Sequence, residues 1–184
     1  MMKAILRSLA LTFAGSLCAA GFALAQTAVT APQSTAPVCA PTGTLTQFVD
    51  ALDAAVSGPA NGDRSCLRAL ALPGAQLIPL AKDASDNWQP HPLTVEDWIT
   101  RVAQRGPAPF YEVQVRYSVK EYGQIAQIWS LYEIRETPTG KATLRGINAI
   151  QAIRTADGWK LSHIDWKAES AGDPIPADAM PAGK

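Results

Sequence analysis

The sequence has 184 residues, enough for one domain with a core of its own. Hydrophobic residues make up 47% of the chain and charged residues 17%, as in ordinary globular proteins. The 16 basic and 16 acidic side chains cancel, so no excess of charge favours binding to nucleic acid or to an anionic membrane. The sequence also lacks a glycine-rich phosphate loop, a G-x-S-x-G motif and an H-E-x-x-H motif.

The first 25 residues, MMKAILRSLALTFAGSLCAAGFALA, have the form of a secretory signal peptide. A short basic start leads into an apolar stretch that ends in the small-residue site Ala-Leu-Ala. We therefore expect cleavage after Ala25 and a periplasmic or secreted protein with no stable membrane insertion. An uncleaved anchor is the alternative, although the apolar run is near the short limit for a span. Lipoprotein processing at Cys18 is less favoured, because Leu17 stands where a small residue is needed.

Residues 26–43 are rich in Ala, Thr and Pro, and this composition predicts a disordered linker. Residues 170–184 have a similar composition and are expected to form a disordered tail, which leaves one domain at 44–169. Outside the signal peptide the chain has two cysteines, Cys39 and Cys66. In an exported protein they are more readily explained by a disulfide than by two reactive thiols, and the bond would attach the linker to the domain.

The first half of the domain shows helical spacing of apolar residues. Residues 45–56 follow a capping Thr44, residues 63–72 contain Cys66, and residues 94–105 precede a Gly-Pro stop. A short strand is expected at 75–81. The second half changes to strand-like runs at 110–119, 124–136, 142–154 and 159–169, separated by turn residues. This order predicts an α+β fold in which about three helices cover one face of a curved antiparallel sheet.

The two faces of the sheet can be assigned because side chains alternate along a strand and cross-strand partners share a face. If every turn leaves an even number of loop residues, one face becomes almost wholly apolar and the helices should cover it. One extra residue would invert the assignment of every strand beyond it. On the apolar face, the positions expected to line a pocket are Tyr117, Ser130, Tyr132, Gln151, Ser162 and Trp166.

A few hydroxyls and an amide among apolar walls are typical of a small-molecule site. The alternative is that these groups only form hydrogen bonds with one another or with the backbone. We expect Tyr132 and Gln151 to be the first residues to contact a ligand. No acidic residue falls on this face, and an enzyme needs a titratable group in its pocket, so binding is favoured over catalysis.

The opposite face carries His163 and Asp165, two positions apart in the last strand. They could form an oriented catalytic base, but a solvated pair on an outward face is favoured. With two histidines in all, and both thiols assigned to a disulfide, neither a metal site nor a cofactor is expected. The same face has an apolar patch that predicts contact between two copies in a homodimer, formed by Trp129, Leu131, Ile150 and Leu161.

The runs Ile125–Glu133, Arg145–Gln151 and Trp159–Trp166 resemble the nuclear transport factor 2-like superfamily, which includes ketosteroid isomerase and SnoaL-type cyclases. The resemblance covers most of 44–169 and is nearest to the exported members of unassigned function. It implies a cone-like fold with a hydrophobic pocket, which often dimerises through its sheet. It implies no particular activity, since this fold serves both binding and catalysis. The leading hypothesis is a small-molecule-binding or scaffold domain, and the alternative is an isomerase, dehydratase or cyclase acting on a small hydrophobic substrate.

Overall fold

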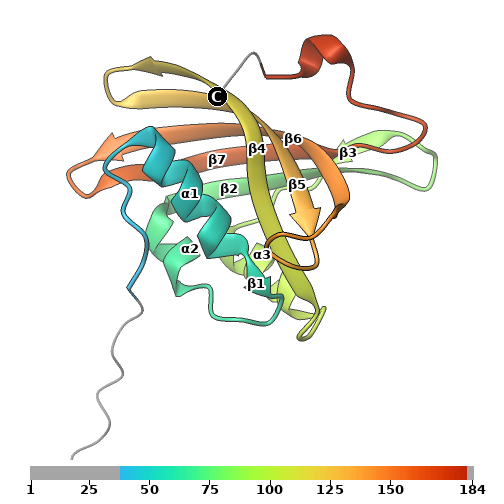
Figure 1. Ribbon diagram of the computed structural model, residues 1–184, viewed down its shortest axis with the longest axis horizontal. Coiled ribbons are helices and arrows are strands. Elements are labelled where there is room, and N and C mark those ends of the chain that lie inside the picture. The colour runs from blue at the N-terminus through green and yellow to red at the C-terminus, as the bar shows by residue number, and fades with distance from the viewer. Residues whose placement is uncertain (1–37, 182–184) are drawn as a thin grey trace, which may run out of the picture. The chain divides into compact units, whose positions relative to one another are not determined.

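The computed structural model describes residues 38–181 and contains three α-helices beside a seven-stranded curved sheet in that range (Figure 1). The helices are α1 (Leu45–Val56), α2 (Ser65–Leu70) and α3 (Val95–Ala103). The α+β prediction with three helices is therefore confirmed. The signal peptide and residues 26–37 of the expected linker lie outside the described residues. Among the described residues, no helix is long and apolar enough to cross a membrane.

The sheet is mixed rather than antiparallel, which corrects the sequence prediction. Its order is β1-β4-β5-β6-β7-β2-β3, and β2 pairs with β7 in parallel while its other pairs are antiparallel. Between β2 and β7 the chain passes through α3 and the whole meander, which is long enough to bring it back in the same direction. The strands are β1 (Gly58–Pro59), β2 (Ala71–Lys82), β3 (Trp88–Pro90), β4 (Pro109–Tyr122), β5 (Ile125–Arg135), β6 (Ala142–Thr155) and β7 (Gly158–Ala168).

Helices α1 and α3 begin at the expected threonines, each in a capping box. The Thr44 hydroxyl accepts from the backbone N–H of Gln47, and the Gln47 side chain accepts in return from the backbone N–H of Thr44. Thr94 and Asp97 repeat the arrangement at α3. The buried side of α1 runs from Phe48 to the end of the helix and belongs to the main core: Phe48, Val49, Ala51, Leu52, Ala55 and Val56.

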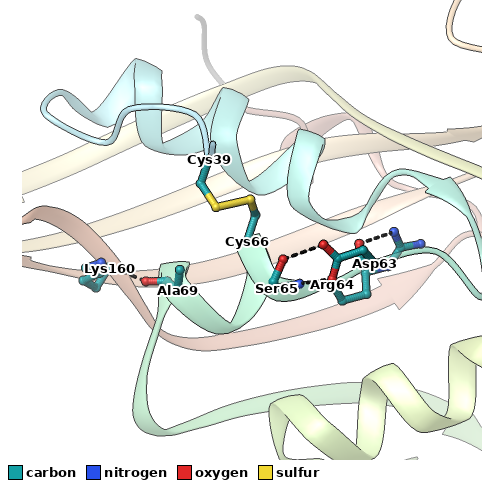
Figure 2. Close-up of a disulfide and its surroundings, with 7 residues drawn as sticks. All are labelled: Cys39, Asp63, Arg64, Ser65, Cys66, Ala69 and Lys160. Atoms are coloured by element: carbon teal, nitrogen blue, oxygen red, sulfur yellow. Dashed lines mark hydrogen bonds between the residues drawn. A yellow bond between two sulfur atoms is a disulfide. The ribbon is translucent and has the colours of Figure 1, made fainter. Parts of the chain in front are cut away.

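Cys39 and Cys66 form the predicted disulfide (Figure 2). The bond joins the segment before α1 to the first turn of α2, and Lys160 of β7 donates to the Ala69 carbonyl at the other end of α2. The two cysteines are 27 residues apart in the chain. In the chain-entropy model, closing a loop of this size stabilises the fold by about 3 kcal/mol.

Three β-bulges decide which side chains face the helices. Each adds one unpaired residue to one strand: Val115 in β4, Thr143 in β6 and Ser162 in β7. Every bulge inverts the alternation beyond it, so the face assignment made from even loops fails on parts of three strands. On β5 the assignment is right, and Ser130 and Tyr132 face the core.

On β6 the faces are the reverse of those predicted. Ile150 is fully buried in the core rather than on the outer patch, and Gln151 is exposed on the outer face rather than in the pocket. Leu161, the second patch residue placed outside, is also fully buried in the core. On β7 the Ser162 bulge restores the predicted faces, so Ile164 points inward.

Residues 170–181, placed in a disordered tail by their composition, adopt a defined course that ends in η1 (Ala177–Ala179) and Pro181. Figure 1 shows η1 on the opposite side of the sheet from α1 and α2. The indole N–H of Trp129 donates to the Ala179 carbonyl (2.7 Å), and Pro181 is buried. The tail therefore lies on the outer face beside Trp129, one of the two remaining patch residues, and the other, Leu131, is 8% exposed.

Candidate functional site

A cavity of about 520 Å³ lies between the helices and the inner face of the sheet. Most of its wall is apolar and comes from all three helices and from β2, β4, β5, β6 and β7. The polar groups among its lining residues fall into two sets. Glu112, Tyr132 and Asn148 belong to the sheet, whereas Arg101, Gln104 and Arg105 belong to the end of α3 and the residues after it. This volume is within the usual range of small-molecule sites, about 300–1,000 Å³.

Glu112 is the acidic residue of the cavity, and sequence reasoning placed it on the opposite face. Because Val115 is bulged out of register, Glu112 and Gln114 share the inner face with Tyr132 across the strand pair. The backbone of Glu112 is fixed to α1, since its N–H donates to the Ser57 hydroxyl (3.0 Å). The carboxyl oxygen Oε1 accepts from the side-chain amides of Gln114 (2.9 Å) and Asn148 (3.0 Å).

Gln114 is the centre of this network and is buried. Its Nε2 donates both hydrogens, one to Glu112 and one to Asp53 Oδ1 on α1 (3.0 Å). Its Oε1 accepts from the Ser130 hydroxyl and from Asn148 Nδ2 (3.1 Å). The amide therefore uses its full capacity of two donors and two acceptor positions. Such a network fixes the position of Glu112, because a shift would break several bonds at once.

Both carboxyl groups of this network have raised pKa values. Burial is the main cause at Asp53, and the nearby charge of Glu112 adds to it, which together raise the pKa of Asp53 from 3.8 to about 7. Burial also raises the pKa of Glu112, although the amides of Asn148 and Gln114 act against this. Asp53 therefore titrates near neutral pH, and acids with perturbed pKa values beside a cavity are typical of functional sites.

Tyr132 lies against the cavity above a glycine. It pairs with Gly146 on β6, and a methyl group added to Gly146 would stand 2.5 Å from the tyrosine hydroxyl oxygen and 2.6 Å from Cε1. Only glycine leaves room for the ring at this close approach. Burial raises the pKa of the Tyr132 hydroxyl, and the charge of Glu112 adds to the effect, so the hydroxyl keeps its proton at neutral pH and can donate a hydrogen bond.

The structure brings together part of the predicted pocket set. Tyr132 and Trp166 line the cavity. Ser130 is fully buried behind it as a donor to Gln114, and Tyr117 is buried in the adjoining core. Gln151 is exposed on the outer face, and the Ser162 hydroxyl donates to the Gln151 carbonyl at the bulge, so neither belongs to the cavity.

The network residues that the sequence did not reveal are Asp53, Glu112, Gln114 and Asn148. In the run Glu-Val-Gln-Val at 112–115, simple alternation favours placing both valines inside and the polar residues outside. The signal that could have found them is the clustering of an acid and two amides on strands otherwise rich in apolar residues. Two of these residues are only 7% and 2% exposed, Gln114 and Asn148.

His163 and Asp165 do lie on the outer face, paired across β6 with Gln151 and Ala149. Their side chains contact each other, with 2.8 Å between His163 Nε2 and Asp165 Oδ1, and both are partly exposed. They are therefore outside the cavity that contains Glu112. Among residues 38–181, no cluster of three or more His, Cys, Asp or Glu side chains could hold a metal ion.

Comparison with solved structures finds proteins of related fold. An NTF-2 like protein of unknown function from Silicibacter pomeroyi aligns over 68% of this chain and 92% of its own, with 15% identity and a TM-score of 0.48. A protein of unknown function with a cystatin-like fold from Nostoc punctiforme aligns over 69% of this chain and 90% of its own, with 8% identity and a TM-score of 0.50. The structural neighbours of this domain include NTF2-like proteins.

An NTF2-like protein of unknown function from Shewanella baltica gives a similar alignment, over 69% of this chain and 92% of its own, with 10% identity and a TM-score of 0.48. Neither a family model nor a curated protein matches the chain.

The raised pKa of Asp53 predicts a pH-dependent stability. Above about pH 4 the unfolded chain has lost the proton that the folded protein keeps until about pH 7. The stability contributed by this proton is complete at low pH and is lost as the pH rises from about 4 to about 7. Asp53→Asn should therefore reduce the fall in the free energy of unfolding across this window, measured by urea denaturation.

Asp157→Asn is the matched control, because it makes the same change in an exposed turn. It should leave the pH dependence of the wild type unchanged. A wild-type slope that persists in Asp53→Asn would contradict the assignment of the buried proton to Asp53.

Proposed function

We propose that the domain binds a small, mainly apolar molecule in the cavity and holds its polar group against Glu112, Tyr132 and Asn148. The observation that carries this proposal is the placement of a largely buried carboxyl, held by two side-chain amides, in the wall of an apolar cavity. Burying a carboxyl is unfavourable in free energy, and facing a cavity does not offset this cost. A role in stability alone therefore does not explain the position of Glu112.

The unused hydrogen-bonding capacity of the wall supports the same proposal. Both amide donors bond Glu112 at Oε1, and within residues 38–181 no donor reaches Oε2. The Tyr132 hydroxyl likewise has no hydrogen-bond partner in the described part of the chain. One acceptor and one donor are thus left for a ligand in an environment where each bond is stronger than in water.

An exported location and a homodimer stay predictions from the sequence. For the dimer, the expected patch is now reduced to Trp129 and Leu131, because Ile150 and Leu161 are core residues. We propose that a second copy could use this face only where residues 170–181 form part of the contact or move away from it, since the tail already bonds Trp129.

The binding proposal is tested with the neutral fluorescent probe N-phenyl-1-naphthylamine. Leu144 lines the cavity and is 41% exposed, so Leu144→Trp should narrow the cavity without disturbing the core. We expect the fluorescence titration to show about tenfold weaker binding in this variant, a loss of about 1.4 kcal/mol.

Val115→Trp provides the control, because Val115 is 36% exposed at the bulge and does not line the cavity. This variant should bind the probe as the wild type does. Equal binding by wild type, Leu144→Trp and Val115→Trp would show that the probe binds elsewhere, and the proposed site would be wrong.

An acid–base enzyme is the second candidate, favoured by the raised pKa of Glu112 in the same cavity wall as a tyrosine hydroxyl that can donate a hydrogen bond. In its carboxylate form, Glu112 would take a proton from the carbon beside a carbonyl, while Tyr132 donates a hydrogen bond to the carbonyl oxygen. Return of the proton from Glu112 to another carbon would complete an isomerisation. The sequence predicted no acidic residue in the pocket and therefore favoured binding. In the structure, however, Glu112 lines the cavity.

Glu112→Gln separates the two candidates. A panel of small β,γ-unsaturated cyclic ketones is followed by the ultraviolet absorbance of the conjugated product. An enzyme should lose at least about 100-fold of its rate in this variant, as expected for removal of a general base, while probe binding is retained. Glu133→Gln is the control, because Glu133 is paired with Arg135 away from the cavity. No conversion by the wild type, or equal rates in wild type and Glu112→Gln, would count against catalysis by this residue.

A further inference from the structure

Two arginines line the cavity at the end of α3. Arg101 lies in the last turn of the helix and Arg105 just beyond it, and both side chains are exposed. Within the described range neither forms an ion pair with an acid. The acids of the same helix have other partners, since Glu96 is bound by Arg68 and Asp97 caps the helix through Thr94. The cavity thus has two uncompensated guanidinium groups at its rim.

One of these arginines lies in line with the carboxyl inside the cavity, with Phe110 between them. The Arg105 guanidinium stacks over the Phe110 ring, 5.1 Å from its centre. Phe110 and Glu112 are two residues apart in β4 and therefore share the inner face, about 6.6 Å from each other along the strand. Arg105, Phe110 and Glu112 therefore form a row on the cavity wall, cationic at one end, apolar in the middle and acidic at the other.

We propose that the ligand of this cavity is a small amphipathic carboxylic acid, whose carboxylate binds Arg101 and Arg105 and whose apolar body extends along the cavity to the polar group held by Glu112, Tyr132 and Asn148. This inference rests on the proposed function and specifies its ligand. A guanidinium binds a carboxylate through two parallel hydrogen bonds, and two guanidiniums at the rim of one cavity can bind the same group. The apolar walls between the arginines and Glu112 fit the remainder of the molecule.

The preference for an anion also follows from where the charges lie. A ligand with a cationic head would meet repulsion at the arginines, and an uncharged one would leave them to solvent. The carboxyl of Glu112 is set back along the wall, beyond Phe110, so a carboxylate at the rim is separated from it by about two residues of strand.

The test compares sodium octanoate, octan-1-ol and octylamine, which share one apolar chain and differ in the head group. Binding to the full chain is measured by isothermal titration calorimetry at neutral pH. We expect octanoate to bind at least about tenfold more tightly than octan-1-ol, and octylamine to bind most weakly, because charge-assisted hydrogen bonds to arginine are the stronger ones. Arg101→Gln/Arg105→Gln should remove the preference for octanoate over octan-1-ol.

Lys120→Gln/Lys141→Gln is the matched control. It changes the net charge equally, at two exposed lysines that do not line the cavity, and should keep the preference for octanoate. Equal binding of octanoate and octan-1-ol by the wild type would overturn the inference, as would an octanoate preference that survives in Arg101→Gln/Arg105→Gln. In either case, the proposed function still holds if octan-1-ol binds the wild type and Leu144→Trp weakens that binding. Failure of all three molecules to bind would overturn both.

Discussion

The site depends on one side chain, the buried amide of Gln114. Its two N–H groups bond the carboxyls of Asp53 on α1 and Glu112 on β4, and its oxygen accepts from Ser130 and Asn148. Burying a carboxyl is unfavourable unless hydrogen bonds or protonation compensate; both carboxyls here are hydrogen-bonded, and burial raises the pKa of each. The amide thereby joins helix to sheet and orients Glu112 toward the cavity. The proposed binding and acid–base roles both require that orientation.

The sequence was sufficient for what depends on local chemistry. The helices beginning at Thr44 and Thr94, the strands of the meander and the Cys39–Cys66 bond all follow from caps, periodicity and cysteine usage, and all are present. The parallel pairing of β2 with β7 was missed, because it is a contact between distant segments that leaves no local pattern. The course of residues 170–181 was missed for a related reason: a polar composition does not reveal packing against a Trp129 that lies far away in sequence.

The candidate site could be predicted only in part from the sequence. One unrecognised extra residue in a strand reverses the predicted face of every residue beyond it. One extra residue at Val115 turns Glu112 inward, and the bulges at Thr143 and Ser162 invert β6 and then restore β7. His163 and Asp165 were placed outside correctly, but only because two inversions cancel. Tyr132 was found because β5 contains no bulge of its own. Bulges depend on tertiary fit, and no motif in these strands marks them in advance.

The most direct test of the account is the titration of the Glu112 side chain, followed by carbon-detected NMR of its carboxyl resonance in the intact protein. Assignment is made by loss of that signal in Glu112→Gln. A buried, cavity-facing carboxyl predicts a midpoint above the ordinary 4.5 of a glutamate. A midpoint at or below 4.5 would place Glu112 in solvent or in an ion pair, and the inward-turned carboxyl on which the proposed function depends would be contradicted.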